Sequence, residues 1–391
     1  MRVLIVLTYY RPHTSGLTVY AERLATGLAA RGHAVTVLTS RFDPATLPSE
    51  VRDGVRIVRA PVLFRVSKGV VMPTFGWLAT RLTREHDVIS LHLPQFDAAG
   101  VALRGRLMRK PTTLTYHCDL SLPPGAFNRV ANHAVDLMNG AAGRLCHRVI
   151  AYTDDYASHS PFLARYRHKL AVIPPPVELP EPPPEAAGAF RARWVPAGAG
   201  PVIGMAARLA TEKGVEVLVG ALPRILRAFP SAVVLFAGQH EGVLGEAAYA
   251  RLIGRALEPF ADRWRFVGVL DPAQMTSFFR AIDVITVPSL NSTESFGLVQ
   301  VEAMLAGTPS VASGLPGVRQ PVLQTGMGEV VPVGDAAALG DAIVRVLRER
   351  PRYVRPREEI AGRFSTQRTV EEYEALFEDL ASRLGRWAGA T

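Results

Sequence analysis

The stretch Val287–Val311 places two carboxylates, Glu294 and Glu302, eight positions apart around the start of a predicted helix. A polar loop precedes the helix, and Gly307 and Pro309 end it. Because the free amides at a helix start carry partial positive charge, this loop is a natural anion seat. Carboxylates beside a bound phosphate would repel it unless they hold hydroxyl groups. The pattern therefore predicts a ligand with a central diphosphate and a sugar at each end, as in a nucleotide sugar.

A second group of polar residues stands between a predicted strand, Val202–Ala207, and a predicted helix, Val215–Phe229. It contains the cations Arg208 and Lys213, and Gly214 follows at once. Cations at the carboxyl end of a strand can neutralise a diphosphate, and their effect grows as negative charge develops there. The chain holds 4 lysines against 40 arginines. A lysine beside a glycine at this position therefore indicates a residue chosen for its chemistry.

These patterns resemble the signature of retaining GT-B glycosyltransferases, the group that includes sucrose and glycogen synthases and many bacterial cell-surface enzymes. The residues that carry the resemblance are Arg208, Leu209, Lys213 and Gly214 in one motif and Glu294, Phe296, Gly297, Leu298, Glu302, Ala303 and Met304 in the other. The resemblance implies an α/β protein of the GT-B class, with two Rossmann-like, doubly wound parallel-sheet domains facing a central cleft. It also implies hexose transfer from a nucleotide-diphosphate sugar, UDP- or GDP-linked, to a hydroxyl group with retention of configuration.

The resemblance gives roles to single donor-site residues. Arg208 and Lys213, with the amides of the three residues from Phe296, would stabilise the leaving diphosphate without a metal ion or other cofactor. The chain contains no Asp-x-Asp metal clamp. Glu302 would hold the ribose hydroxyls, and Glu294 would act on the donor sugar as nucleophile or as stabiliser of an oxocarbenium ion. Backbone groups around Val267 would seat the base.

The first half opens as a strand–helix–strand unit that lacks the Gly-x-Gly-x-x-Gly of dinucleotide binders. Gly16 directly precedes a helix predicted from Leu17 to Arg31, and a glycine there lets a ligand approach the backbone. The predicted strand Thr112–Tyr116 delivers His117 at its carboxyl end, where open parallel sheets bind ligands. The resemblance places such a glycine near the donor phosphate and the acceptor, and such a histidine against the donor sugar.

The length of 391 residues suits two domains rather than one core. Residues 174–184 contain seven prolines, so this stretch is expected to be extended and semi-rigid. We predict an acceptor domain over residues 1–175, a proline-rich linker over 176–198, a donor domain over 199–365, and a final helix within 366–391 that crosses back onto the first domain.

The formal net charge of +9 is unevenly placed. Residues 1–180 hold 22 basic against 12 acidic residues, a net of +10, whereas residues 181–391 hold 22 against 23, a net of −1. An anionic partner would therefore meet the first half. Basic residues there frame an apolar group made up of Val70, Val71, Met72, Phe75, Trp77 and Leu78. This arrangement suits an anionic membrane surface, and an arginine-rich surface over a buried segment is the alternative.

No apolar run reaches the roughly 18 residues that a membrane-spanning helix needs, and Val3–Leu7 is too short for the apolar core of a signal peptide. We therefore expect a cytoplasmic protein, or one bound peripherally at the inner face of the cell membrane. Cys118 and Cys146 form neither a disulfide nor a metal framework. The basic, partly apolar first half favours a lipid-linked, glycan or phospholipid acceptor.

Other functions fit parts of the sequence. A sugar-nucleotide epimerase, or another GT-B enzyme with a soluble acceptor, would share the two-domain plan. A cofactor-dependent phosphorylase would need a Schiff-base lysine, and none of the four lysines stands in such a context. A nucleic-acid-binding protein would suit the positive charge, but it would leave the donor-site motifs without a role. No nucleic-acid partner is therefore expected.

Overall fold

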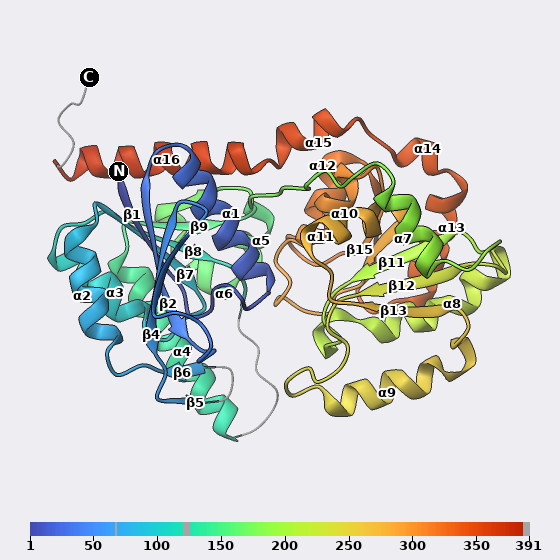
Figure 1. The fold of residues 1–391 in the computed structure, drawn as a ribbon, viewed down its shortest axis with the longest axis horizontal. Helices are drawn as coiled ribbons and strands as arrows, with labels where there is room; N and C mark the ends of the chain where they lie inside the picture. The colour runs from blue at the N-terminus through green and yellow to red at the C-terminus, as the bar shows by residue number, and fades with distance from the viewer. Residues whose placement is uncertain (67–68, 120–125, 386–391) are drawn as a thin grey trace. The chain divides into compact units, whose positions relative to one another are not determined.

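The computed structural model describes residues 1–66, 69–119 and 126–385, and for residues 66 and 126–131 it describes the backbone alone. The chain divides into two compact units (Figure 1). Unit 1 comprises Met1–Pro176 together with the chain from Phe364 onward, and unit 2 comprises Val177–Arg363. Two units are the expected result for a chain of this length, because a single apolar core stops growing at roughly 250–300 residues.

Strands and helices alternate through unit 1, as expected where a mostly parallel sheet is covered on both faces. Its strands are β1 (Arg2–Val6), β2 (Ala34–Arg41), β3 (Ser49–Arg52), β4 (Val55–Pro61), β5 (Phe64–Val66), β6 (Gly69–Val71), β7 (Val88–Leu93), β8 (Thr112–Tyr116), β9 (Arg148–Ala151) and β10 (Leu170–Val172). Its helices are α1 (Gly16–Ala30), α2 (Phe75–Glu85), α3 (Ala98–Leu107), α4 (Ala126–Leu145), α5 (Asp154–His159), α6 (Pro161–Ala164), the 3-10 helix η1 (Arg167–Lys169) and α16 (Thr366–Arg383).

The main sheet of unit 1 has its described strands in the order β10-β9-β8-β7-β1-β2-β4-β3, and β5 and β6 form a separate hairpin. All neighbours in the main sheet are parallel except β3 and β4. The chain moves from β1 to β2 on one side and later returns to β7 on the other. The carboxyl ends of β1 and β7 therefore form a topological switch point, where such sheets open a crevice for ligands.

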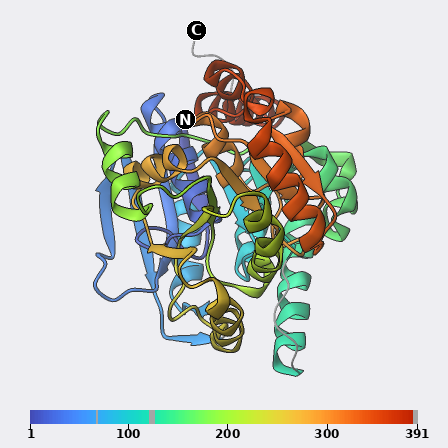
Figure 2. The ribbon, with the colours of Figure 1, turned by 90° about the vertical axis from the view of Figure 1, so that its right-hand side faces the viewer.

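Helices cover both faces of this sheet. Leu4 and Val6 of β1 pack in a buried cluster with α2, α3 and α4, while α1 and α16 lie against each other on the opposite face (Figures 1 and 2). The hydroxyl of Tyr373 on α16 lies 2.8 Å from the Tyr20 hydroxyl of α1 and 2.6 Å from the Thr115 hydroxyl of β8. The predicted return of the last helix is thus observed, and α16 is part of the core of unit 1.

Unit 2 repeats the alternation with a smaller sheet. Its strands are β11 (Val202–Ala206), β12 (Val233–Ala237), β13 (Trp264–Gly268), β14 (Val284–Val287), β15 (Ser310–Ser313) and β16 (Gly328–Val331). Its helices are α7 (Ala186–Trp194), η2 (Thr211–Lys213), α8 (Val215–Ala228), α9 (Ala247–Leu257), η3 (Glu258–Phe260), α10 (Pro272–Ala281), α11 (Leu298–Leu305), α12 (Gln320–Thr325), α13 (Ala336–Arg348), α14 (Arg350–Tyr353) and α15 (Arg357–Arg363).

The six described strands of unit 2 are all parallel and lie in the order β13-β12-β11-β14-β15-β16. The chain moves from β11 to β12 and β13, then crosses to β14 on the other side. The switch point of this sheet is therefore at the carboxyl ends of β11 and β14. Both motifs singled out from the sequence begin at these two ends.

The stretch predicted as a linker is only partly extended. Residues 173–183 lack helix and strand, and the carbonyls of Pro174 and Pro180 are held by the Thr369 and Thr276 hydroxyls of their own units. Residues from Val177 onward belong to unit 2 and include α7. The buried Phe190 of α7 packs against Phe278 of α10, with ring centroids 6.3 Å apart. The apolar face of α7 thus places this part of the predicted linker in the packed unit.

The apolar residues that basic residues flank in the sequence of unit 1 fall into a buried set and an exposed set in the structure. Met72, Phe75 and Leu78 are buried against the sheet of unit 1, whereas Val71 and Trp77 are exposed. The membrane interpretation is therefore wrong for the three buried residues, because α2 turns Phe75 and Leu78 toward the core and Met72, just before it, packs in the same cluster. In the part of the chain that is described, no helix has the length and apolar character to cross a bilayer.

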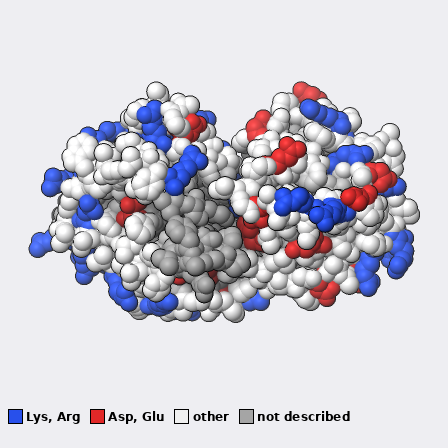
Figure 3. All heavy atoms as spheres, turned by 90° about the horizontal axis from the view of Figure 1, so that it is seen from below, with Lys and Arg blue, Asp and Glu red and all other residues white. Residues whose placement is uncertain are grey.

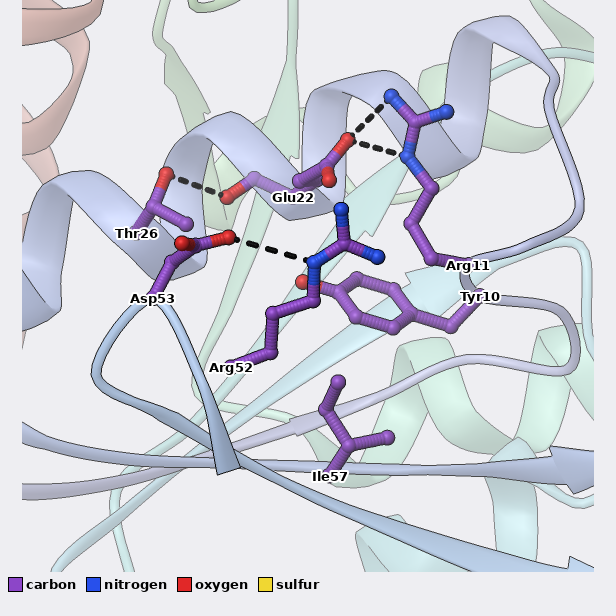
Figure 4. A pocket seen from close by; sticks show the side chains of 7 residues that line it. All are labelled: Tyr10, Arg11, Glu22, Thr26, Arg52, Asp53 and Ile57. Carbon is purple, nitrogen blue, oxygen red and sulfur yellow. Dashed lines mark hydrogen bonds and ion pairs between the residues drawn. The ribbon is translucent and has the colours of Figure 1, made fainter. Parts of the chain in front are cut away.

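A small pocket in unit 1 lies between α1 and the turn that joins β3 to β4 (Figure 4). It is lined by Tyr10, Arg11, Glu22, Thr26, Arg52, Asp53 and Ile57. Its charged side chains pair with one another, Arg11 with Glu22 at 2.5 Å and Arg52 with Asp53 at 3.5 Å. Burial raises the pKa of the Tyr10 phenol, which stays neutral. The charges that line the pocket are therefore paired within the helix end and within the strand turn, and the pocket presents no net charge.

Candidate active site

The loops after β11 and β14 lie against each other at the switch point of unit 2. The amide of Leu290 donates to the carbonyl of Glu212 at 2.9 Å. Gly214 has a φ of +66°, and a side chain there would collide with the carbonyl oxygen of Pro288. Only glycine combines this backbone conformation with so close an approach. Gly214 is therefore required by the contact between the two loops.

Lys213 and Glu294 form the centre of this arrangement. The Lys213 Nζ lies 2.6 Å from Glu294 Oε2, and the two side chains are 20% and 21% exposed. The other carboxylate oxygen, Oε1, accepts from the amide of Gly297 at 3.0 Å. One carboxylate thus joins the cation of the first motif to the helix start of the second. The three groups thus lie together, and Glu294 occupies the Gly297 amide in the structure.

The start of α11 is fixed from inside the unit. Phe296 is buried in the core, so it contributes its backbone rather than its ring. The buried Gln300 donates to the carbonyls of Phe296 at 3.2 Å and Val318 at 2.9 Å. Within the described chain, the amides of Leu298 and Val299 find no acceptor. These two donors provide an anion seat beside Glu294.

Arg208 stands at the rim of the same edge. Its Nη2 lies 3.2 Å from Glu212 Oε1, and its side chain is 45% exposed. An exposed ion pair of this kind contributes roughly 0–1 kcal/mol. A diphosphate can therefore compete for Arg208 at little cost. Glu302 projects from α11 five residues beyond Gly297 and is half-buried.

The edge continues along β12 and β13. The amide of Gly238 donates to the carbonyl of Gly268 at 2.7 Å, and Gly238 is held by a positive φ against the Ala207 carbonyl. The side chain of Val267 is buried, so only the backbone of this residue is available to a ligand. His240 stacks on Phe266 with ring centroids 4.5 Å apart.

His117 lies in unit 1 at the carboxyl end of β8, where the sequence placed it. Both ring nitrogens already have partners: Nε2 lies 2.9 Å from Nδ1 of His92, and Nδ1 is hydrogen-bonded to the Tyr152 hydroxyl. The ring of Tyr20 packs edge-on against His117 at 4.9 Å. Burial lowers the pKa of His117 far below its usual range and that of His92 to about 3. Both imidazoles are neutral at physiological pH.

Gly16 is the first residue of α1, and the Ser15 side chain caps this helix through the amide of Thr18 at 3.3 Å. A methyl group at position 16 would meet no other described residue within 4 Å, apart from its chain neighbours and its own helix backbone, and the φ of Gly16 lies outside the region that favours glycine. Nothing in the described fold therefore requires glycine here. This supports the expectation that a ligand, rather than the protein, approaches the backbone.

Two contributors to the site were not predicted. Tyr152 directly follows β9, so the rule that singled out His117, a polar residue at the carboxyl end of a parallel strand, would also have found it. Gln300 is buried on α11, and a glutamine inside an apolar helical pattern was the available signal. The structure thus joins Lys213, Glu294 and Gly297 in unit 2, while Gly16 and His117 belong to unit 1.

Two protein-family models match the chain. The model of glycosyltransferase family 4 matches residues 14–181, and that of the glycosyl transferases group 1 matches residues 200–349. The chain is 30% identical over 387 residues to 2-deoxystreptamine N-acetyl-D-glucosaminyltransferase of Streptomyces fradiae, covering 92% of this chain and 90% of that protein. It is 28% identical over 396 residues to phosphatidyl-myo-inositol mannosyltransferase of Mycobacterium leprae, covering 98% of each.

Solved structures share the whole fold. Sucrose-phosphate synthase from Thermosynechococcus elongatus has a TM-score of 0.77 at 21% identity, covering 98% of this chain and 99% of that one. HepE of Anabaena, solved in complex with UDP, has a TM-score of 0.76 at 19% identity, covering 97% of this chain and 100% of that one. Two parallel-sheet α/β units with these neighbours define a GT-B fold. The chain belongs to the glycosyltransferases of family 4 and group 1, and it is a glycosyltransferase enzyme.

Proposed function

We propose that this glycosyltransferase moves a hexose from a nucleotide-diphosphate sugar, UDP- or GDP-linked, to a hydroxyl acceptor with retention of configuration and without a metal ion. The observation that carries the proposal is the junction of Lys213, Glu294 and the start of α11 at the switch point of unit 2. The UDP bound in the HepE structure and the sugar-transferring relatives support a nucleotide-sugar donor.

The ion pair between Lys213 and Glu294 gives the binding step its chemistry. An incoming diphosphate takes Lys213 and Arg208 as counterions and the amides of Leu298 and Val299 as hydrogen-bond donors. Glu294 is then free to turn to a hydroxyl of the donor sugar. Because the Lys213 and Glu294 side chains are about one-fifth exposed, this exchange of partners does not require the core to open.

The transfer step breaks the bond between the anomeric carbon and the diphosphate oxygen. The acceptor oxygen forms a bond to the same carbon on the same face, and its proton passes to the leaving diphosphate. Lys213, Arg208 and the helix start stabilise the charge that builds on this leaving group, and such preorganised donors are a major source of rate enhancement. Glu302 holds the ribose, and backbone groups near Val267 seat the base.

For the acceptor, we propose a lipid-linked substrate met at an anionic membrane surface. Leu63, Phe64 and Val71 of the β5–β6 segment and Trp77 of α2 are exposed, and the Arg81 guanidinium lies 5.0 Å from the Trp77 ring centroid. Basic side chains surround uncharged surface on the face of unit 1 seen in Figure 3. The phosphatidyl-myo-inositol relative acts on a lipid by its name, whereas the 2-deoxystreptamine relative favours a soluble acceptor as the second candidate.

The donor proposal is tested by thermal shift and calorimetry with UDP, GDP and ADP and their glucose and mannose conjugates, in buffer containing EDTA. We expect one nucleotide series to stabilise the wild type, and Lys213→Ala and Glu302→Ala to weaken that ligand at least tenfold. Arg224→Ala is the matched control, because Arg224 also forms an ion pair in unit 2, with Asp341 at 3.0 Å. Unchanged affinity in Lys213→Ala would remove the proposed diphosphate seat.

The acceptor proposal is tested by sedimentation with vesicles of neutral lipid alone and with added anionic lipid. We expect binding to the anionic vesicles, reduced by Trp77→Ser and by high salt. Leu252→Ser is the control, since Leu252 is an exposed apolar residue of unit 2. Sedimentation with neither vesicle would favour the soluble acceptor.

A further inference from the structure

We propose that Glu246 and Tyr249, which flank the start of α9, are positioning residues for Lys213. The inference rests on the diphosphate seat proposed above, and it concerns how that seat is held in place. Lys213 ends the short η2 helix, and its side chain meets Glu294. A three-residue 3-10 helix has few hydrogen bonds of its own. Its orientation must therefore come from outside the turn.

Glu246 holds the beginning of this turn. Its Oε2 atom accepts from the amide of Thr211 at 3.2 Å and from the Thr211 hydroxyl at 2.7 Å. The amide of Glu246 itself donates to the Val243 carbonyl at 3.1 Å, and the Val243 side chain is buried in the core of unit 2. The backbone that carries the carboxylate is thus tied to a residue of the core.

Tyr249 holds the other side of the turn. Its hydroxyl accepts from the amide of Val215, the first residue of α8, at 3.1 Å, and it donates to the carboxylate of Glu216. Burial and the bond to Glu216 raise the pKa of the Tyr249 phenol, so it remains a donor. The first amide of α8 is therefore satisfied within the chain, and the phosphate-binding role falls to α11.

The two residues that Glu246 and Tyr249 bind lie on either side of Lys213. Thr211 and Val215 lie two residues on either side of Lys213, and Gly214 between them is held against Pro288. The contacts also place two carboxylates, Glu246 and Glu216, near a seat for an anion, which Coulomb repulsion would disfavour. Both carboxylates form hydrogen bonds that fix the turn, Glu246 with Thr211 and Glu216 with Tyr249. The geometry points to a clamp, formed by Glu246 and Tyr249, that sets where the Lys213 ammonium group meets the diphosphate.

The test is a double-mutant cycle on the full-length chain. The probe is UDP or GDP, whichever stabilises the wild type more, and affinity is measured by calorimetry. We expect Glu246→Ala and Tyr249→Phe each to weaken binding about tenfold, a coupling typical of residues in one bonded unit. In a Lys213→Ala background the same changes should alter affinity less than twofold. Glu246→Gln should restore most of the loss, because its amide oxygen can still accept from Thr211.

Two controls separate positioning from general damage. Glu258→Ala removes an exposed carboxylate just after α9, and Tyr353→Phe removes a tyrosine–glutamate bond elsewhere in unit 2, at 2.7 Å from Glu329. Both should bind the probe as the wild type does. The variants should also raise KM for the nucleotide sugar more than they lower kcat, a split that loss of folded protein would not produce.

Two results would count against the clamp in different ways. Equal losses with and without Lys213 would show that Glu246 and Tyr249 act independently of it, which overturns this inference and leaves the diphosphate seat intact. Wild-type affinity in Lys213→Ala alone would overturn the seat itself, and the clamp with it.

Discussion

The carboxyl ends of the two sheets carry opposite chemistry. In unit 1, His117 is buried and neutral, and its two ring nitrogens are bonded to His92 and Tyr152. In unit 2, Lys213 and Glu294 are charged, partly exposed and paired with each other. A locked neutral ring can orient a neighbour but cannot neutralise charge. A partly exposed ion pair can change partners when a diphosphate arrives. Under the proposed function, charge stabilisation would therefore be concentrated in unit 2.

The largest effect is expected when the charge of the Glu294 carboxylate in unit 2 is removed. Glu294→Gln keeps the size of the side chain and removes its charge. We expect kcat to fall by about 10²–10³, the range found when a preorganised electrostatic group is removed, and the melting temperature to change little. Steady-state kinetics of nucleotide release measures this. Near-normal kcat would show that the Glu294 carboxylate has no role in the transfer step.

Lowering the pH should test the role of the buried, neutral histidines of unit 1. Nine of the ten histidines lie in unit 1 and only His240 lies in unit 2. Burial lowers the pKa of His86, His92 and His117. Because these folded-state values lie below the ordinary 6.5, the unfolded chain binds the protons more strongly. The stabilisation is fully present above about pH 6.5 and is lost as pH falls toward the folded values.

As the pH falls below about 6.5, each such ring lowers the free energy of unfolding by up to about 1.4 kcal/mol per pH unit. Between pH 6.5 and 5.5 we expect unit 1 to lose roughly 2–4 kcal/mol from its free energy of unfolding, while unit 2 changes much less. Hydrogen exchange read by mass spectrometry reports the two units separately. Equal losses in both units would contradict the assignment of acid sensitivity to the buried histidines.

Tyr152→Phe should sharpen the picture of the locked ring. The change removes the hydroxyl bonded to His117 Nδ1 and leaves a buried ring nitrogen without that partner. We expect a loss of about 1–3 kcal/mol in the free energy of unfolding, with nucleotide affinity unchanged because the diphosphate seat is in unit 2. Denaturant titration and calorimetry measure the two quantities. Tyr166→Phe, which removes a bond to the Gly140 carbonyl at 2.7 Å, is the matched control in unit 1.

The smallest structural effect is expected at Gly16. Because a methyl group there approaches no distant side chain or backbone among the described residues, Gly16→Ala should leave the free energy of unfolding unchanged or raise it by about 0.5–1 kcal/mol. Turnover should nevertheless fall, since the methyl group occupies space meant for a ligand. Gly188→Ala, on α7 and equally open, is the control for the helix effect. Full activity in Gly16→Ala would show that no ligand approaches this position.

Much of the alternation could be predicted because each element carries its own signal. The helix expected over Val215–Phe229 is observed as Val215–Ala228, and the helix expected to stop at Gly307 is observed as Leu298–Leu305. Apolar periodicity and helix-ending glycines are local properties, so one sequence reveals them. The family resemblance implied that Lys213 and Glu294 act on one donor, and the structure places the two side chains 2.6 Å apart.

The missed features depend on contacts between distant residues. α2 was interpreted by composition, although its buried positions 75, 78, 79 and 82 follow helical spacing. The bond between Tyr152 and His117 joins residues 35 apart, and the ion pair between His33 and Glu374 joins residues 341 apart. No local pattern encodes such partners. The occupation of the Gly297 amide by Glu294 was also beyond the sequence, because it depends on a single rotamer.

The return of α16 to unit 1 has a consequence for synthesis on the ribosome. The hydroxyl of Tyr373 completes a buried cluster whose other members, Tyr20 and Thr115, are made more than 250 residues earlier. Unit 2 is continuous in the chain, from Val177 to Arg363, and all of its strands emerge before α16 does. The strands of unit 1 are therefore made before unit 2 but complete their packing after it, and a chaperone would find their apolar surface open until α16 has been made.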